Sequence, residues 1–96
     1  MPKGYWLATY KKIESKDNLG NYAAKATEII KSFGGKPLVR GGQYVCLGGE
    51  EYPRTVIWEF ASYNTAEKCY SSSEYQAAWA LAKNSTERNF QIVEGV

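Results

Sequence analysis

The residues best placed for chemistry are Arg40 and Glu59, which stand in two neighbouring stretches rich in strand-forming side chains. If a turn at Gly48 to Glu51 joins these stretches, counting back from it places Arg40 opposite Glu59 on one sheet face. Two charged residues in an apolar strand lower stability by desolvation, unless they form a good ion pair with each other or serve a function. Two interpretations follow: a cross-strand ion pair, or a site in which Arg40 holds a substrate carboxylate and Glu59 is the catalytic base.

The chain contains no histidine. Its absence removes the commonest general base, the commonest metal ligand, His-ligated haem and the Ser-His or Cys-His forms of nucleophilic catalysis. The two cysteines, Cys46 and Cys69, are too far apart for a CxxC motif. We expect both to be reduced core residues, the first in a strand and the second in a helix. The sequence therefore predicts no metal site, and no glycine pattern in it indicates a cofactor.

Aromatic side chains are the second candidate for chemistry, with eight tyrosines, three tryptophans and three phenylalanines. Most such rings are expected to fill the core. The alternative is a cavity between helices and sheet, lined by rings and tyrosine hydroxyls, that takes a flat organic ligand. The residues predicted to line it are Tyr22, Arg40, Tyr70, Tyr75 and Trp79.

The charge pattern argues against two classes of partner. The net charge is only +2 and the basic residues are scattered, whereas a nucleic-acid binder normally carries a basic stripe. The sequence shows no apolar run of bilayer length and no signal-peptide pattern. We expect a cytoplasmic protein that binds neither nucleic acid nor membranes.

The elements that must position these residues follow from periodicity and turn residues. A strand is predicted over 4–13, and a helix follows the polar break at 15–18, with one apolar stripe from Leu19 to Phe33 and a glycine stop at Gly34. Strands over 38–47, interrupted at Gly41, and over 52–60 form an antiparallel hairpin. After Ser62 a helix runs to residue 70, a second covers 74–85, and 90–93 form the closing strand.

This order predicts one α+β domain over residues 1–96, a ferredoxin-like βαββαβ sandwich with an extra short helix before the last strand. The helices can cover only one face of the antiparallel sheet. The first and third strands nevertheless carry apolar side chains on both faces, as in Trp6 next to Leu7 and Val56 next to Ile57. We therefore expect a homodimer that packs sheet face to sheet face.

Four segments, in this order along the chain, resemble the DUF1330 family: FGGKPLVRGG (33–42), IWEFAS (57–62), YSSSEYQAA (70–78) and VEGV (93–96). The resemblance implies a dimeric α/β-barrel, a fold shared with antibiotic-biosynthesis monooxygenases, haem-degrading monooxygenases and muconolactone isomerases. It implies no specific function. Family members often carry an arginine in the last helix, where this chain has WALA (79–82), so no anion-binding role is expected from that helix.

Two classes of function remain open at this point. The first is a cofactor-free enzyme of monooxygenase or isomerase type that acts on a small organic metabolite. The second is a non-catalytic dimer, linked to small-molecule binding or to stress. Convergent polar groups in one pocket favour the enzyme, and a filled interface between sheet and helices favours the second class.

Overall fold

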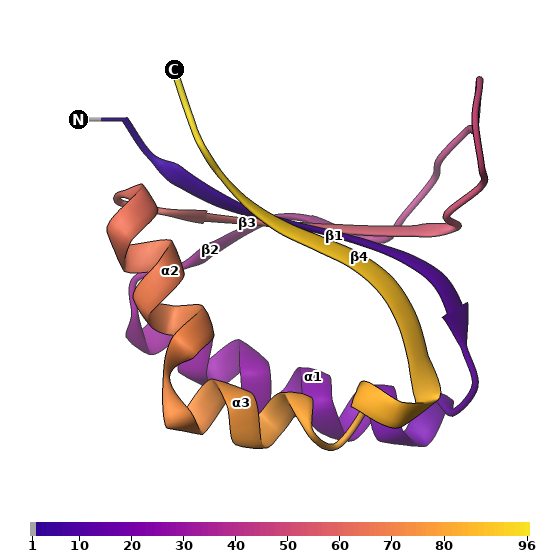
Figure 1. Ribbon diagram of the computed structural model, residues 1–96, viewed down its shortest axis with the longest axis horizontal. Coiled ribbons are helices and arrows are strands. Elements are labelled where there is room, and N and C mark those ends of the chain that lie inside the picture. The colour runs from indigo at the N-terminus through magenta and orange to yellow at the C-terminus, as the bar shows by residue number, and fades with distance from the viewer. Residues whose placement is uncertain (1) are drawn as a thin grey trace.

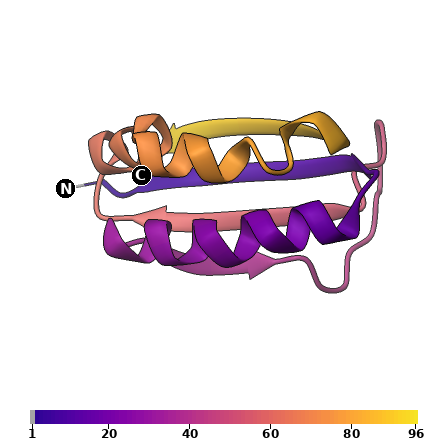
Figure 2. The ribbon, with the colours of Figure 1, turned by 90° about the horizontal axis from the view of Figure 1, so that it is seen from below.

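The computed structural model describes residues 2–96. It confirms the predicted α+β architecture: one antiparallel sheet in the order β2-β3-β1-β4, with the helices on one face (Figure 1). In chain order the elements are β1 (Gly4–Ile13), α1 (Lys16–Ser32), β2 (Lys36–Arg40), β3 (Arg54–Phe60), α2 (Tyr63–Ser71), α3 (Ser73–Trp79), a short 3₁₀ helix (Lys83–Ser85) and β4 (Thr86–Glu94). Seen from the helix side, α1 runs along β2 and β3, and α2 and α3 run along β1 and β4 (Figure 2).

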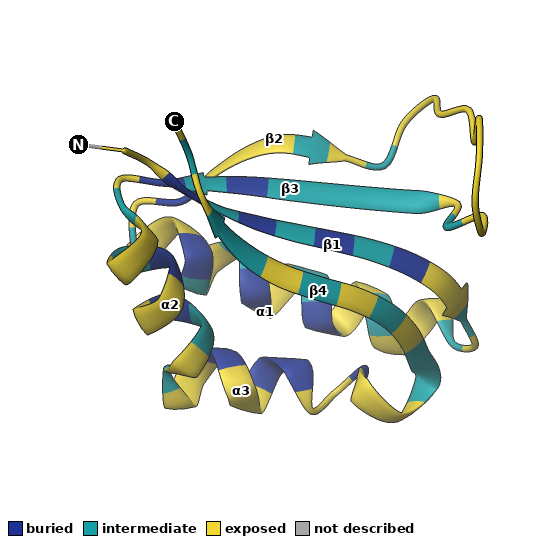
Figure 3. Ribbon diagram, turned by 45° about the horizontal axis from the view of Figure 1, so that its top comes forward, coloured by how far each residue is buried: buried dark blue, intermediate teal, exposed yellow. Residues whose placement is uncertain are grey.

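The central strand β1 shows how the sheet divides its side chains. Trp6, Ala8 and Tyr10 are buried toward the helices, whereas the alternate residues Tyr5 and Leu7 are only partly buried on the outer face. Figure 3 shows buried and partly buried positions alternating along β1. This two-residue alternation follows from the pleat of a strand. The outer face therefore keeps apolar side chains that no helix covers.

Trp6 is the centre of the core and is 1% exposed. Its indole N–H donates to the carbonyl of Ala66 in α2 at 2.9 Å, so that the largest core side chain has no unpaired polar atom. The rings of Phe60, Tyr75 and Phe90 lie with their centroids 5.1, 4.9 and 5.2 Å from it. One tryptophan thus joins β1, β3, β4 and both short helices.

Helix α1 begins and ends where the sequence predicts, within a few residues. The Ser15 hydroxyl accepts from the Asn18 N–H at 3.1 Å, and Gly34 takes a left-handed conformation with φ 80° just after the last turn. Tyr22, Ala26 and Ile30 form the buried stripe. The predicted helix over 19–33 is confirmed in type and face.

The region after α2 differs from the prediction. Ser72 caps α3 by accepting from the Tyr75 N–H at 3.2 Å, so the helix begins at Ser73, one residue before the predicted start. The helix ends at Trp79 instead of Ser85, because successive i to i+3 bonds from residues 81, 82 and 85 tighten the chain into turns. The last strand then runs over 86–94, longer than the predicted 90–93, since it pairs with nearly the whole of β1.

The predicted strand over 38–47 is wrong beyond Arg40. Gly41 and Gly42 have φ 76° and 93°, a conformation that ends an extended strand. Residues 41–53 instead form a loop that rises on the outer side of the sheet (Figure 1), and Cys46 lies exposed in it, so its predicted place in a core strand is also wrong. Cys69 is buried in α2, as predicted.

The close contact between β1 and the start of α2 gives a test of the fold. A Cβ added at Gly4 would lie 2.5 Å from the Ser62 carbonyl oxygen, whereas one added at Gly20 in α1 meets nothing within 4 Å. Gly4→Ala should lower the free energy of unfolding by about 1–3 kcal/mol through overpacking. Gly20→Ala, the matched control, should raise it by about 0.5–1 kcal/mol because alanine favours the helix. Urea denaturation measures both, and a neutral Gly4→Ala would contradict this packing.

Candidate functional site

The predicted Arg40–Glu59 pair does not form. Arg40 lies opposite Val56 and so faces the helices, with its guanidinium carbon 5.8 Å from the centroid of the Trp58 ring. Glu59 lies on the outer face, where it accepts from the Lys3 ammonium and the Tyr5 hydroxyl, each at 3.3 Å. The two side chains point to opposite faces of the sheet, and Glu59 cannot act as a base toward a ligand that Arg40 holds.

The error in register has a local cause. The prediction assumed a continuous hairpin with a four-residue turn. In the structure β2 ends at Arg40 and β3 begins only at Arg54. A register shift between Pro37 and Val39 moves the pairing again. A bulge of this kind changes which face each later residue occupies.

The predicted aromatic residues do meet, and they surround an arginine that the sequence analysis did not select. Arg88 of β4 extends between the sheet and the helices. Its Nη1 donates to the hydroxyls of Tyr10 at 3.2 Å and Tyr22 at 3.4 Å, and its Nη2 donates to the hydroxyl of Tyr75 at 3.1 Å. Tyr22 and Tyr75 are also joined directly, with their hydroxyl oxygens 2.6 Å apart.

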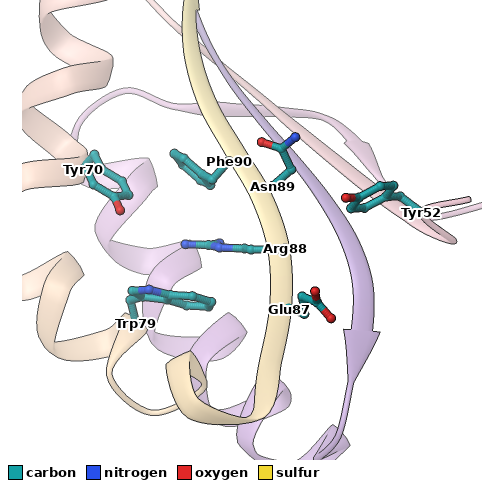
Figure 4. A pocket seen from close by; sticks show the side chains of 7 residues that line it. All are labelled: Tyr52, Tyr70, Trp79, Glu87, Arg88, Asn89 and Phe90. Carbon is teal, nitrogen blue, oxygen red and sulfur yellow. The ribbon is translucent and has the colours of Figure 1, made fainter. Parts of the chain in front are cut away.

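Aromatic rings hold the guanidinium plane of Arg88. Its central carbon lies 3.5 Å from the centroid of the Trp79 ring and 4.5 Å from that of Phe90. Figure 4 shows the guanidinium extended over Trp79, with Phe90 and Tyr70 beyond it on the same side of β4. Stacking of this kind is favourable for a weakly hydrated cation such as arginine.

The charge of Arg88 has no carboxylate partner among residues 2–96. The ion pairs of this part of the chain all use lysines: Lys3 with Glu59, Lys11 with Glu50 and Lys12 with Glu14. A partly buried cation is normally paired, because desolvation disfavours an isolated charge. The tyrosine hydroxyls and aromatic faces replace a counterion here.

The cluster has more donors than acceptors. Arginine carries five N–H donors, and the three contacts of Arg88 occupy three of them; the Nε–H has no acceptor among the described residues. The tyrosines each accept from Arg88, and only one hydroxyl hydrogen is used between Tyr22 and Tyr75. Tyr10 therefore keeps its hydroxyl hydrogen unused, as does one of the other two tyrosines. A positive group with spare donors is suited to an anion.

Burial keeps the hydroxyls of Tyr22 and Tyr75 protonated. It raises the pKa of Tyr22 and Tyr75 above the ordinary value of a phenol. Burial alone would lower the pKa of Arg88, but the three tyrosines more than offset it and the pKa lies above its ordinary value. At neutral pH the cluster therefore consists of one cation and neutral hydroxyls.

An open pocket of about 510 Å³ lies beside edge strand β4. On the helix side its walls include Tyr70, Trp79, Arg88 and Phe90, whereas its other lining residues lie on the far side of the strand (Figure 4): Tyr52, Glu87 and Asn89. The predicted ligand-binding residues Tyr70 and Trp79 thus line one pocket, with Tyr22 and Tyr75 behind Arg88. Arg40, the last residue of β2, does not line this pocket.

Arg88 was missed because the last strand was predicted to begin at Phe90. Extending that strand back by two residues places Arg88 on the same face as Phe90 and Ile92, both of which pack against the core. The alternation of these three residues with Asn89 and Gln91 was the available signal.

The element order, sheet order and one-sided helices define a ferredoxin-like α+β protein. The model of the DUF1330 family, a domain of unknown function, matches residues 3–96, and the chain belongs to this family. No curated protein shows a significant sequence match.

Solved structures agree on the fold. The methylated RPA0582 protein, known from Rhodopseudomonas palustris, is 14% identical with a TM-score of 0.81, over 99% of this chain and 82% of that one. A dimeric ferredoxin-like protein of unknown function from Thermobifida fusca is 10% identical with a TM-score of 0.64, over 97% and 91% of the two chains. A Bacillus halodurans protein of the ethyl tert-butyl ether D family is 13% identical with a TM-score of 0.60, over 100% of both.

Two properties of residues 2–96 bear on the class of site. No helix there is long and apolar enough to cross a membrane. No group of three or more histidine, cysteine or acidic side chains is placed to hold a metal ion.

The buried ionisable groups predict how stability depends on pH. Burial raises the pKa of the Cys69 thiol from 9.0 to about 12. Since the unfolded chain ionises first, the free energy of unfolding should be unaffected by this group below pH 9.0 and should fall as the pH rises from there toward about 12. Cys69→Ala should therefore lose less stability than the wild type between neutral pH and pH 10. Denaturant titrations at several pH values test this, and parallel losses would contradict it.

Proposed function

We propose that this protein binds a small planar organic anion, an aromatic carboxylate in the simplest form, in the pocket beside β4. The observation that carries the proposal is Arg88, a partly buried cation with unused donors and no carboxylate partner among the described residues. A ligand carboxylate would supply the missing negative charge and acceptors. We expect it to bind the free donors of the guanidinium.

The pocket also offers surfaces for a ring. Tyr70 and Phe90 are half-buried and lie with ring centroids 5.0 Å apart at an angle of 34°. A volume of about 510 Å³ falls within the range of about 300–1,000 Å³ usual for small-molecule sites. On the helix side, where Arg88 is the one charged lining group, aromatic walls favour a ligand that is apolar over most of its surface and anionic at one end.

Binding without turnover is the function the geometry supports best. On the helix side the pocket contains no carboxylate or histidine, and burial keeps Tyr22 and Tyr75 protonated, so neither can act as a base at neutral pH. The second candidate is a cofactor-free enzyme of isomerase or monooxygenase type. The donors of Arg88 and the hydroxyl pair of Tyr22 and Tyr75 favour it, because such donors can stabilise an oxyanion that forms on a bound substrate.

Replacing Arg88 separates a binding role from a structural one. Arg88→Met should weaken the binding of benzoate by about tenfold or more, since charged hydrogen bonds contribute about 1.5–3 kcal/mol. The melting temperature should fall moderately while unfolding stays cooperative, because the three tyrosine hydroxyls lose their shared donor and the rings lose the stacked cation. Calorimetric titration and thermal melts measure the two effects.

Two comparisons complete this experiment. Benzamide, a neutral isostere of benzoate, should bind wild type and Arg88→Met equally weakly, and Lys83→Met at an exposed position should leave benzoate binding unchanged. Equal benzoate binding by wild type and Arg88→Met would refute the proposal. Turnover of a bound anion by the wild type, lost in Arg88→Met, would favour the enzyme.

We also propose that the protein is a homodimer formed through the outer face of the sheet. That face carries partly exposed side chains that no helix covers: Tyr5, Leu7, Thr55, Ile57 and Val93. The loop 41–53 rises on the same side (Figure 1) and presents Val45 and Leu47, which are 71% and 90% exposed. Apolar surface of this extent is typical of an interface, and several structures with this fold come from proteins described as dimeric.

A charge placed at the centre of this face tests the dimer. Leu7 lies opposite Ile57 on the outer side, so Leu7→Lys and Ile57→Lys should each shift the protein toward a monomer in sedimentation equilibrium. Leu81→Lys, at a position 40% exposed just after α3, should sediment with the same dimer mass as the wild type. A wild type that sediments as a monomer at micromolar concentration would show the interface to be wrong.

A cytoplasmic location completes the proposal. Cys46 is exposed and unpaired and Cys69 is buried and unpaired, a state that suits a reducing compartment.

A further inference from the structure

All three arginines of the chain lie on the helix-facing side of the sheet. Arg54 and Arg88 flank Tyr10 in one row across β3, β1 and β4, and Arg40 lies in the next row, opposite Val56. None of the three forms an ion pair with a carboxylate of the described residues. Arg88 lines the pocket beside β4, but Arg40 and Arg54 do not, so the proposed function gives them no role.

Arg54 is partly buried, whereas Arg40 is exposed at the end of β2, and each has one neighbour that limits where its guanidinium lies. Arg40 lies over the Trp58 ring at 5.8 Å, and Trp58 is buried in the core. Arg54 packs against the backbone at Gly41, where an added Cβ would lie 2.6 Å from its Nη1. Gly41 also donates its N–H to the Thr55 carbonyl at 2.8 Å, so the glycine that ends β2 is fixed beside Arg54. The two guanidinium groups therefore line the same cavity.

That cavity is a crevice between α1 and strands β2 and β3. Its volume is about 50 Å³; both arginines line it with the side chains of Tyr10, Tyr22 and Thr27, and its remaining walls are apolar. Tyr10 and Tyr22 line this crevice and also accept hydrogen bonds from Arg88, which is not itself a lining residue. The crevice is thus a different cavity from the pocket beside β4, and it is too small for an aromatic ring.

We infer that Arg40 and Arg54 form a second anion site, which takes a single small oxyanion such as phosphate or the phosphate group of a larger molecule. Two guanidinium groups beside one crevice repel each other unless an anion lies between them. Arginine presents a planar set of donors that matches oxyanions, and an aromatic face keeps that plane oriented. The size of the crevice selects the oxyanion rather than a ring.

The direct test is a calorimetric titration of the full chain with inorganic phosphate. The double variant Arg40→Gln/Arg54→Gln should bind phosphate about tenfold more weakly or worse, since it loses two charged donors. Arg88→Met should weaken phosphate binding less than the double variant does, because Arg88 does not line the crevice and only shares Tyr10 and Tyr22 with it. Thermal melts establish that each variant is folded.

Two neighbouring glycines provide a matched pair of variants that keep both charges. Gly41 and Gly42 have left-handed backbones, but only a Cβ at Gly41 meets Arg54. Gly41→Ala should weaken phosphate binding more than Gly42→Ala does, because it displaces a guanidinium as well as straining the backbone.

The outcomes are distinct from those for the first pocket. Benzoate binding that survives in Arg40→Gln/Arg54→Gln, with phosphate binding lost, supports two separate sites. No phosphate binding by the wild type at millimolar concentration would overturn the second site and leave the first intact. Phosphate binding that depends on Arg88 instead of Arg40 and Arg54 would overturn it as well.

Discussion

The partly buried charge of Arg88 is the constraint around which this small domain is arranged. Its guanidinium is held by three tyrosine hydroxyls and two ring faces, without a carboxylate among residues 2–96. An interior built only for stability would have an apolar residue at this position, since burying an unpaired cation is unfavourable. This loss of stability is explained if the charge of Arg88 has a function, and the open pocket beside β4 leaves the guanidinium accessible.

The fold supplies this arrangement through the central strand. β1 places Trp6 and Tyr10 on the helix side, where one anchors the core and the other meets Arg88. The break between α2 and α3, made by the Ser72 cap, turns Tyr75 and Trp79 toward the same point. Residues from three regions far apart in sequence therefore converge because the sheet order brings β4 beside β1 and the helices cover both strands.

The sequence predicted most of the architecture, because local rules determine it. Aromatic and β-branched content predicted β1, and the polar break at 15–18 and the Gly34 stop predicted α1. The ring of aromatic residues was also predicted, since their helical spacing placed Tyr22, Tyr75 and Trp79 inward. The two wrong predictions concerned pairing between distant strands. A loop replaces the predicted hairpin at Gly41, so Arg40 does not lie opposite Glu59. β4 begins four residues earlier than predicted, so Arg88 was not assigned to the sheet. Register and strand length are set by partners, and a single sequence does not display them.

The central claim is that the guanidinium of Arg88 receives an organic anion. Nitrogen-15 NMR of the arginine Nε–H groups tests it most directly, because the three arginines can be assigned one by one by substitution. On titration with benzoate, the Arg88 signal should shift and saturate while those of Arg40 and Arg54 stay in place, and benzamide should move none of them. A benzoate titration that leaves the Arg88 signal unchanged, or one that benzamide reproduces, would contradict the account.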